Sequence, residues 1–386
     1  MNILVINSGS SSLKYQLFKM PSPQPVSSGL VERIGERGSP VPDHRVALEQ
    51  VLTVLSEGEG SVIKSPDDID AVGHRVVHGG EQFSDATIIT AQVKQQIRKL
   101  FSLAPLHNPA NYTCIEVAEE TFPNATQIAI FDTAFHQTIP EQAYRYALPG
   151  SYYQDHGIRV YGFHGTSHKY VSEQAAAWLG NPEARLISIH LGNGCSMTAV
   201  KAGRSIDTSM GFGPLSGLVM GTRSGDIDPS VIFHLMEHSG YTLEQLSKLL
   251  NKQSGLLGVG GSGDMRDIRS RIANGDESAR LAVNLYAYRI RKFIGAYTAV
   301  LNGLDAIIFT AGVGENDAAM RAAVCEEMDY LGILIDPEKN NIREKHLRDI
   351  SAAGSPVRIL VIPTNEEYEI AHQCYDLLTP KDTLII

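Results

Sequence analysis

The sequence has few of the features that mark secreted, membrane-bound or zinc-binding proteins. Its 386 residues include only four cysteines, which form neither a CxxC pair nor a His/Cys metal spacing. We therefore expect small structural thiols in a reducing compartment. The first apolar run, Ile3–Ile6, is too short for a signal sequence, and no run approaches the length of a membrane span. These absences predict a cytoplasmic protein.

Positive charge is also scarce. The formal net charge is -10, which argues against nucleic acid or an anionic membrane as the main partner. A small anionic substrate remains compatible with this charge, because a binding site needs only a few local cations. The apolar content of 43% and charged content of 20% are ordinary for a globular protein. The length favours two domains over one.

Several well-known catalytic motifs are missing. The P-loop pattern GxxxxGK[ST] is absent, and "AGVGEN" (311–316) lacks the third glycine of a dinucleotide-binding fingerprint. His164 and His168 have the spacing of a zinc-protease pair, but Gly165 occupies the position where HExxH requires glutamate. We therefore assign His164 to a phosphate-transfer site and give His168 a structural role.

Short strands flank polar glycine turns at two places in the chain. In "INSGSSSLKYQLF" (6–18), backbone N–H groups and serine hydroxyls could surround phosphate oxygens, with Lys14 adding a point charge. The alternative is a polar, exposed hairpin. The stretch "LISIHLGNGCSMTAV" (186–200) repeats the same design, and "KAGRSIDTSM" adds a further hairpin arm. Either the fold is duplicated, with a cleft between its halves, or the similarity is coincidental.

Strands and helices alternate along the rest of the sequence, which indicates an α/β protein. Residues 91–102 place their apolar side chains on one helical face. Thr242 and Gln245 form a capping box, and Asp228–Pro229 starts another helix. The apolar stretch 281–301 predicts a buried helix, and a buried strand is expected to run into a glycine loop at 311–316.

Four charged residues have unusual neighbours. Arg75 lies in "GHRVVHGG" and Arg223 in "MGTRSGDIDP", and arginine in such glycine-rich loops often binds carboxylate or phosphate bidentately rather than merely solubilising a surface. Asp132 and Glu366 each follow a predicted strand, where α/β sheets bind ligands. One or two carboxylates with phosphates and water suffice for Mg²⁺, although either residue could instead cap a helix.

Taken together, these stretches resemble the acetate kinase family over nearly the whole chain. The ordered motifs that carry the resemblance are "VINSGSSSLKYQLF", "GHRVVHGG", "LAPLHNP", "FDTAFHQTIP", "YGFHGTSHKYV", "HLGNGCS", "DTSMGF", "MGTRSGDIDP", "AGVGEN" and "PTNEE". The family belongs to the sugar kinase, Hsp70 and actin superfamily. The resemblance implies duplicated actin-like (ribonuclease H-like) ATPase domains flanking a nucleotide cleft. It places the N-terminal domain at 1–132 plus 368–386, and the C-terminal domain at 133–367.

The resemblance also implies a role for each residue that matches a family motif. The catalytic residues would be Asp132, as acid/base, with His164 and Arg223 stabilising the transition state. Arg75 would bind the substrate carboxylate, and a small apolar pocket for the methyl group would comprise Val77, Leu106, Phe163 and Pro214. Mg²⁺, for which Mn²⁺ could substitute, would be held by Asn7 and Glu366. The nucleotide would contact Ser10, Ser12, Lys14, His190, Leu191, Gly192, Asn193, Gly194, Asp264, Met265, Arg266, Gly312, Val313, Gly314, Glu315 and Asn316.

The implied reaction is the reversible, in-line transfer of a phosphoryl group from ATP to acetate. Acetate is already ionised at neutral pH, with a pKa near ~4, so Asp132 need not deprotonate it. We instead expect Asp132 to orient the metal, its waters or an arginine. The resemblance further implies a cytoplasmic homodimer in acetyl-CoA biosynthesis.

Three other functions remain open: a propionate kinase with the same machinery, a non-catalytic nucleotide-gated protein of the actin/Hsp70 type, and, weakly, a dehydrogenase. The sequence departs from the family pattern at Gly213 and Ser216, usually threonine and glutamate, and at Gly263, usually serine. The segment near 35–50 is shortened. Gly213 beside Pro214 could loosen the acyl pocket.

Overall fold

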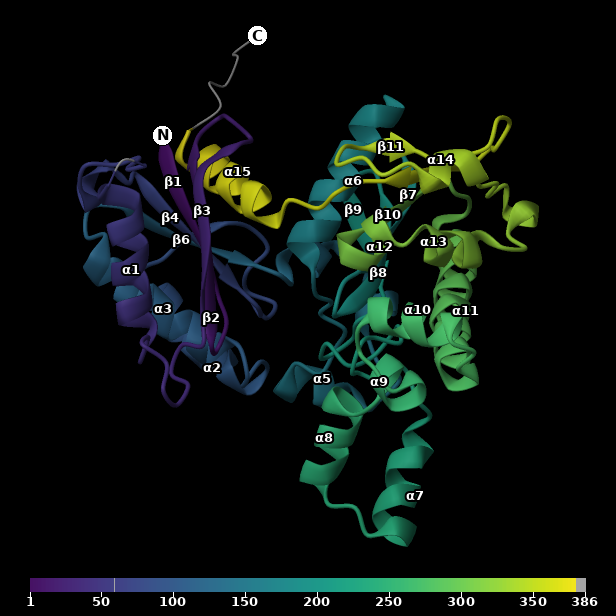
Figure 1. Ribbon diagram of the computed structural model, residues 1–386. Coiled ribbons are helices and arrows are strands. Elements are labelled where there is room, and N and C mark those ends of the chain that lie inside the picture. The colour runs from purple at the N-terminus through teal and green to yellow at the C-terminus, as the bar shows by residue number, and fades with distance from the viewer. Residues whose placement is uncertain (59, 380–386) are drawn as a thin grey trace. The chain divides into compact units, whose positions relative to one another are not determined.

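The structure, a computed structural model, describes residues 1–58 and 60–379. The chain divides into two compact units. The first comprises Met1–Gln137 and the segment that begins at Asn365, and the second is Thr138–Thr364. Each unit contains one six-stranded mixed sheet with helices on both faces (Figure 1).

The first sheet starts with a three-stranded antiparallel meander. Its strands in chain order are β1 (Asn2–Ser8), β2 (Ser12–Lys19), β3 (Pro25–Glu32), β4 (Ala71–Val76), β5 (Thr87–Ile88) and β6 (Thr126–Phe131). Their order across the sheet is β3-β2-β1-β4-β6-β5, with β4 parallel to β1, β6 parallel to β4, and β5 antiparallel at the edge. This arrangement brings the ends of β1, β4 and β6 to one edge of the sheet.

Side chains alternate between the two faces of the first sheet because a strand has a period of two residues. Leu4 and Ile6 pack in one core with α1 (His44–Ser56) and α3 (Asn108–Thr121). Ile3 and Val5 pack in another core with Ile370 and its neighbours on α15 (Glu366–Leu378). The remaining helical segments of this unit are η1 (Pro66–Asp68), α2 (Ala91–Lys99), η2 (Leu100–Ser102) and η3 (Ala134–Thr138).

The second sheet repeats the topology of the first. Its strands are β7 (Arg185–Leu191), β8 (Cys195–Lys201), β9 (Arg204–Thr208), β10 (Ala306–Thr310), β11 (Arg348–Asp349) and β12 (Arg358–Val361). The order β11-β12-β10-β7-β8-β9 again combines an antiparallel meander, two parallel neighbours and one antiparallel edge strand. The prediction of a duplicated α/β fold is therefore confirmed.

Two helices cover opposite faces of the second sheet. His168 on α6 (Gly165–Leu179) bonds Ser188 on β7, whereas Tyr286 on α11 (Glu277–Leu301) bonds Cys195 on β8. Cys195 pairs in register with Leu191, an odd-numbered position of β7 that faces away from Ser188. The other helical segments of the unit are α4 (Glu141–Tyr144), α5 (Gly150–His156), α7 (Pro229–Ser239), α8 (Leu243–Lys252), α9 (Gly255–Gly260), α10 (Met265–Ala273), α12 (Ala311–Asn316), α13 (Ala318–Cys325), η4 (Asp329–Leu331) and α14 (Pro337–Asn341).

Local signals in the sequence predicted several boundaries correctly. The Thr242–Gln245 capping box forms at the start of α8, and Asp228 caps α7, which begins at Pro229. The four cysteines are buried and unpaired with one another. None of the helices within the described part of the chain is long and apolar enough to cross a membrane.

Three expectations were wrong. Residues 311–316 form helix α12 directly after β10 rather than a glycine loop, with the reversal made at Ala311, whose φ is 64°. Arg75 lies on β4 and not in a loop. Helix α11 is buried along one side only, since Leu281 and Tyr288 are exposed. An apolar composition cannot distinguish a fully buried helix from one with an exposed apolar stripe.

Candidate active site

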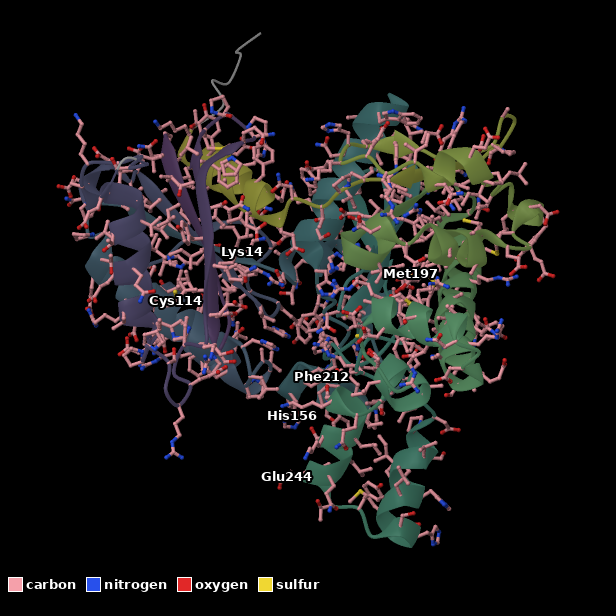
Figure 2. The ribbon with its side chains drawn as sticks, in the orientation of Figure 1. Lys14, Cys114, His156, Met197, Phe212 and Glu244 are labelled. Carbon is pink, nitrogen blue, oxygen red and sulfur yellow. The ribbon has the colours of Figure 1, made fainter. Side chains whose placement is uncertain are left out.

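The first unit presents a polar turn between β1 and β2. The N–H of Gly9 donates to the carbonyl of Ser12 at 2.7 Å and closes the turn. A Cβ at Gly9 would lie 3.2 Å from the Ser12 hydroxyl, so glycine lets that hydroxyl approach the backbone closely. Ser10 is exposed at the tip. Lys14 lies on β2 (Figure 2). It forms an ion pair of 2.6 Å with Glu367 at the start of α15.

Arg75 and Asp132 form a two-point ion pair near this turn. The guanidinium donates from Nε and Nη2 to the Asp132 carboxylate, with a shortest distance of 2.6 Å, while Nη1 donates to Asn7 Oδ1 at 3.2 Å. Asp132 follows β6 directly and is 2% exposed. Burial alone would lower the pKa of Arg75, but the carboxylates of Asp132 and Glu366 outweigh it and raise that pKa. Asp132 therefore orients an arginine, one of the roles expected for it.

Glu366 completes an oxygen-rich cluster in the first unit. Its carboxylate lies 4.0 Å from Arg75 Nε in the first turn of α15, whose N-cap is Asn365. Burial, with the nearby carboxylates of Asp132 and Glu367, raises the pKa of Glu366 although Arg75 opposes them. Carboxylate and amide oxygens are hard ligands, so Asn7 and Glu366 fit Mg²⁺ in their chemistry. A divalent cation would also relieve the crowding of negative charge.

The four residues predicted to surround a methyl group are divided between the units. Val77 follows β4 and is partly buried, whereas Leu106 is 72% exposed. In the second unit Phe163 is buried and Pro214 is partly exposed. A Cβ at Gly213 would meet nothing within 4 Å, so the residue beside Pro214 has open space around it.

In the second unit, the glycine turn between β7 and β8 brings His164 and Arg223 together. A Cβ at Gly194 would lie 3.4 Å from both Arg223 Nη1 and His164 Nε2. Both side chains therefore lie close to the backbone of this glycine. Arg223 Nη1 donates to the carbonyl of Pro214 at 3.1 Å. Burial lowers the pKa of Arg223, and no carboxylate within residues 1–58 and 60–379 pairs with it. A partly buried cation without a counter-ion is suited to bind an anion.

A chain of hydrogen bonds orients the His164 ring. His164 caps α6 in the left-handed region, with φ 57°, and its Nδ1 bonds Ser196 Oγ at 2.8 Å. Ser196 also bonds His168 Nε2 at 2.7 Å, and His168 Nδ1 bonds Ser188 at 2.8 Å. The His164 ring stacks on His190 at 4.3 Å between centroids. His168 is fully buried, which agrees with the structural role predicted for it.

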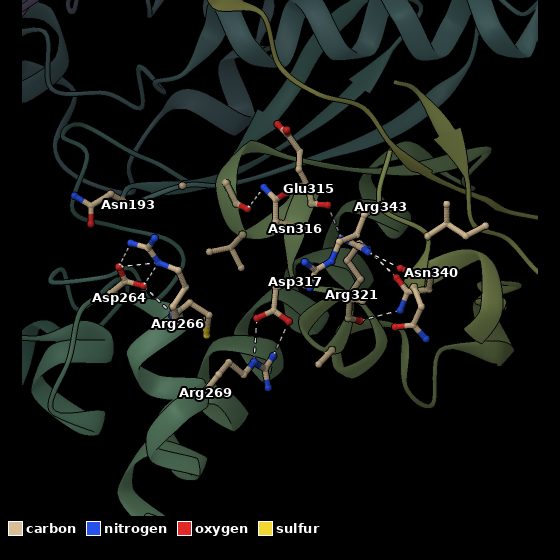
Figure 3. A pocket seen from close by; sticks show the side chains of 18 of the residues that line it. Asn193, Asp264, Arg266, Arg269, Glu315, Asn316, Asp317, Arg321, Asn340 and Arg343 are labelled. Carbon is tan, nitrogen blue, oxygen red and sulfur yellow. Dashed lines mark hydrogen bonds and ion pairs between the residues drawn. The ribbon is translucent and has the colours of Figure 1, made fainter. Parts of the chain in front are cut away.

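The three predicted nucleotide segments of the second unit meet in one pocket. It has a volume of about 1260 Å³ and is lined by residues from the β7–β8 turn, the start of α10 and helix α12 (Figure 3). Among the predicted residues, the lining includes Gly192, Asn193, Asp264, Met265, Arg266, Gly312, Val313, Glu315 and Asn316. This volume is large enough for a nucleotide-sized ligand.

Sequence reasoning missed part of the lining of this pocket. Arg269, Arg321 and the segment 340–343 also contribute to it. Arg321 is fully buried and donates to Asn340 and to the carbonyl of Gly314, which ties α14 to α12. The only sign of these lining residues in the sequence was the presence of arginine in the segments that form α10 and α13. Such arginines are usually solvent-exposed, so they did not indicate a pocket.

The duplicated sheets define two α/β domains of the actin-like ATPase fold. The family model described as the acetokinase family matches residues 2–372, and the chain belongs to this family. It is 56% identical to an acetate kinase of Flavobacterium johnsoniae, over 98% of this chain and 100% of the relative.

Two solved structures are similar over their whole length. A Porphyromonas gingivalis acetate kinase has a TM-score of 0.94 and 45% identity, covering 98% of this chain and 100% of that one. A Francisella tularensis propionate kinase has a TM-score of 0.90 and 43% identity, covering 96% of this chain and 98% of that one.

Proposed function

We propose that the protein transfers the γ-phosphoryl group of ATP reversibly to the carboxylate of acetate, giving ADP and acetyl phosphate. The observation that carries the proposal is the partly buried guanidinium of Arg223, which has no carboxylate partner in the described part of the chain and lies with His164 beside Gly194, next in the chain to the pocket residue Asn193. Phosphoryl transfer needs little covalent chemistry from the protein, and charge neutralisation with positioning provides most of the catalysis.

Arg75 is the residue we assign to the acceptor carboxylate. Asp132 accepts from both Nε and Nη2 along one edge of its guanidinium, so the arginine is oriented before acetate binds. Acetate is ionised at neutral pH and needs no general base. One carboxylate oxygen attacks the γ-phosphorus in line, and the bond to the β–γ bridging oxygen breaks, so that ADP leaves with that electron pair.

His164 and Arg223 neutralise the charge that spreads over the transferring phosphoryl oxygens. Arg223 offers a rigid fork, and His164 donates a hydrogen bond from Nε2 while Ser196 fixes its ring through Nδ1. Asn7 and Glu366 would help to hold Mg²⁺, which neutralises phosphate charge when bound. Lys14, Ser10 and Ser12 contact the phosphates, and the pocket of the second unit takes the nucleoside.

A propionate kinase is the second candidate, favoured by the open space around Gly213. A coupled assay for ADP formation with acetate, propionate and butyrate tests both functions. We expect the highest kcat/KM with acetate and a measurable rate with propionate, because one methylene changes binding by only about 1–3 kcal/mol. A preference for propionate would overturn the choice of acetate, and no ADP formation with any carboxylate would overturn the kinase.

We further propose that the protein is a homodimer. Apolar side chains are exposed on α7, at Val231 and Phe233, and on α11, at Leu281, Leu285 and Tyr288. A second copy of the chain would cover such exposed apolar side chains. Light scattering of the wild type and of Phe233→Glu tests this, since the charge should yield monomers. The cytoplasmic location and the role in acetyl-CoA biosynthesis stay predictions.

A further inference from the structure

The backbone of the serine turn is bonded asymmetrically. Four of the five carbonyls from Ser8 to Ser12 accept hydrogen bonds from within the first unit. By contrast, the N–H groups of Ser10 and Ser11 donate to no acceptor among the residues that the structure describes. A turn in which most carbonyls are bonded and two successive N–H groups are not is suited to an anion.

His44 forms the hydrogen bond to one of these carbonyls, that of Gly9. It is the first residue of α1, it is 9% exposed, and its Nε2 lies 2.9 Å from the carbonyl oxygen of Gly9. Because a carbonyl can only accept, His44 Nε2 must carry the proton. In a trans peptide the C=O and N–H groups point in opposite directions, and the Gly9–Ser10 bond is trans. His44 therefore directs the N–H of Ser10 away from its own ring.

Asn111 acts on the preceding peptide. It is 3% exposed on α3, and its Nδ2 donates to the carbonyl of Ser8 at 2.7 Å. Its Oδ1 accepts from the N–H of Val77 at 3.2 Å. One amide side chain thus connects the serine turn with the segment that follows Arg75.

We propose that His44 is a positioning residue for the nucleotide, because it orients the Gly9–Ser10 peptide so that the Ser10 N–H binds a phosphate oxygen. Asn111 fixes the start of the same turn. This inference rests on the proposed function in one respect, namely that the serine turn binds nucleotide phosphates. His44 itself touches neither substrate. Its contribution is to remove the orientational freedom of one peptide before the ligand arrives.

Two substitutions of His44 separate its hydrogen bond from its bulk. Glutamine places an amide nitrogen near the position of Nε2 and can still donate to Gly9, whereas asparagine is too short and mimics Nδ1. We expect His44→Asn to raise the Kd of ATP about tenfold in titration calorimetry without acetate, and His44→Gln to stay within about twofold of wild type. The KM of acetate should change little in either variant, because His44 does not contact the acceptor segment.

Asn111→Ala serves as a second measurement, since it should raise both the Kd of ATP and the KM of acetate. Asn108→Ala is its matched control: among the described residues this neighbouring buried side-chain amide bonds only the backbone of His78, so the Kd of ATP should not change. A folded His44→Asn protein with the ATP affinity of wild type overturns the inference, and so does a His44→Gln protein as weak as His44→Asn. Failure of the proposed function looks different: wild type would bind ATP but form no acetyl phosphate.

Discussion

Replacing Arg223 by alanine should remove catalysis without lowering the stability of the fold. Its guanidinium is partly buried, this burial lowers its pKa, and no carboxylate in the described part of the chain neutralises it. The charge therefore costs free energy in the folded protein before any phosphate binds. Because its charge destabilises the folded protein, we expect Arg223 to bind the ligand rather than to stabilise the fold.

The magnitudes follow from the contacts. Arg223 Nη1 reaches the carbonyl of Pro214 at 3.1 Å and the sulfur of Met220 at 3.7 Å. Losing one such hydrogen bond costs about 1 kcal/mol of unfolding free energy. Relief of the desolvated charge offsets this, so the melting temperature should stay equal or rise. Loss of one transition-state donor lowers kcat on the order of 10²–10³.

Arg75→Ala provides the contrasting case, because Arg75 has a buried partner. Its removal leaves the Asp132 carboxylate, 2% exposed, without its counter-ion. Breaking a buried pair in this way costs roughly 3–5 kcal/mol. The lower figure applies here since the Arg75 side chain is 21% exposed. For units of this size the melting temperature should fall by roughly 6–12 °C.

Steady-state kinetics and thermal melts of the two variants decide the matter. Arg223→Lys serves as a control that keeps the charge but loses the planar fork, and it should recover only part of the rate. The reasoning is refuted if Arg223→Ala melts several degrees below wild type while turning over normally. It is equally refuted if Arg75→Ala melts at the temperature of wild type.

The other predictions concern pH, metal and substrate size. Burial raises the pKa of Asp207 from 3.8 to about 6, so ionisation of this carboxyl opposes folding at neutral pH. In urea unfolding, Asp207→Asn should therefore be more stable than wild type at pH 7 by up to roughly 3 kcal/mol, and this gain should vanish below pH 4. Equal stabilities at pH 7 would contradict this. Glu366→Gln should raise the Mg²⁺ concentration needed for half-maximal activity, and a metal titration that overlays that of wild type would exclude Glu366 as a ligand. Val77→Ala should shift kcat/KM toward propionate, mainly through KM, and an unchanged ratio would argue against a pocket wall at this position.

Much of the secondary structure could be predicted because its causes are local. The capping box at Thr242 and the proline start of α7 are satisfied within three residues of the chain. The duplication was visible for the same reason: each meander begins with two neighbouring strands joined by a short glycine turn. Helix α12 was missed because two glycines in "AGVGEN" indicate a loop. There, tertiary packing after β10 overrides the weak helix propensity of glycine.

The sequence by itself determined the chemistry available to this protein: a serine turn, two arginines with glycine neighbours, and carboxylates at strand ends. Only the tertiary structure decided how these groups are paired. Arg75 meets Asp132 across 57 residues of chain, and Asn111 meets Ser8 across 103. Such contacts depend on which strands lie side by side and on which face each helix packs. Arg75 has a carboxylate counter-ion, whereas Arg223 has none in the described part of the chain. Two residues of the same type therefore differ in the energy of their charge, and the sequence alone cannot reveal this difference.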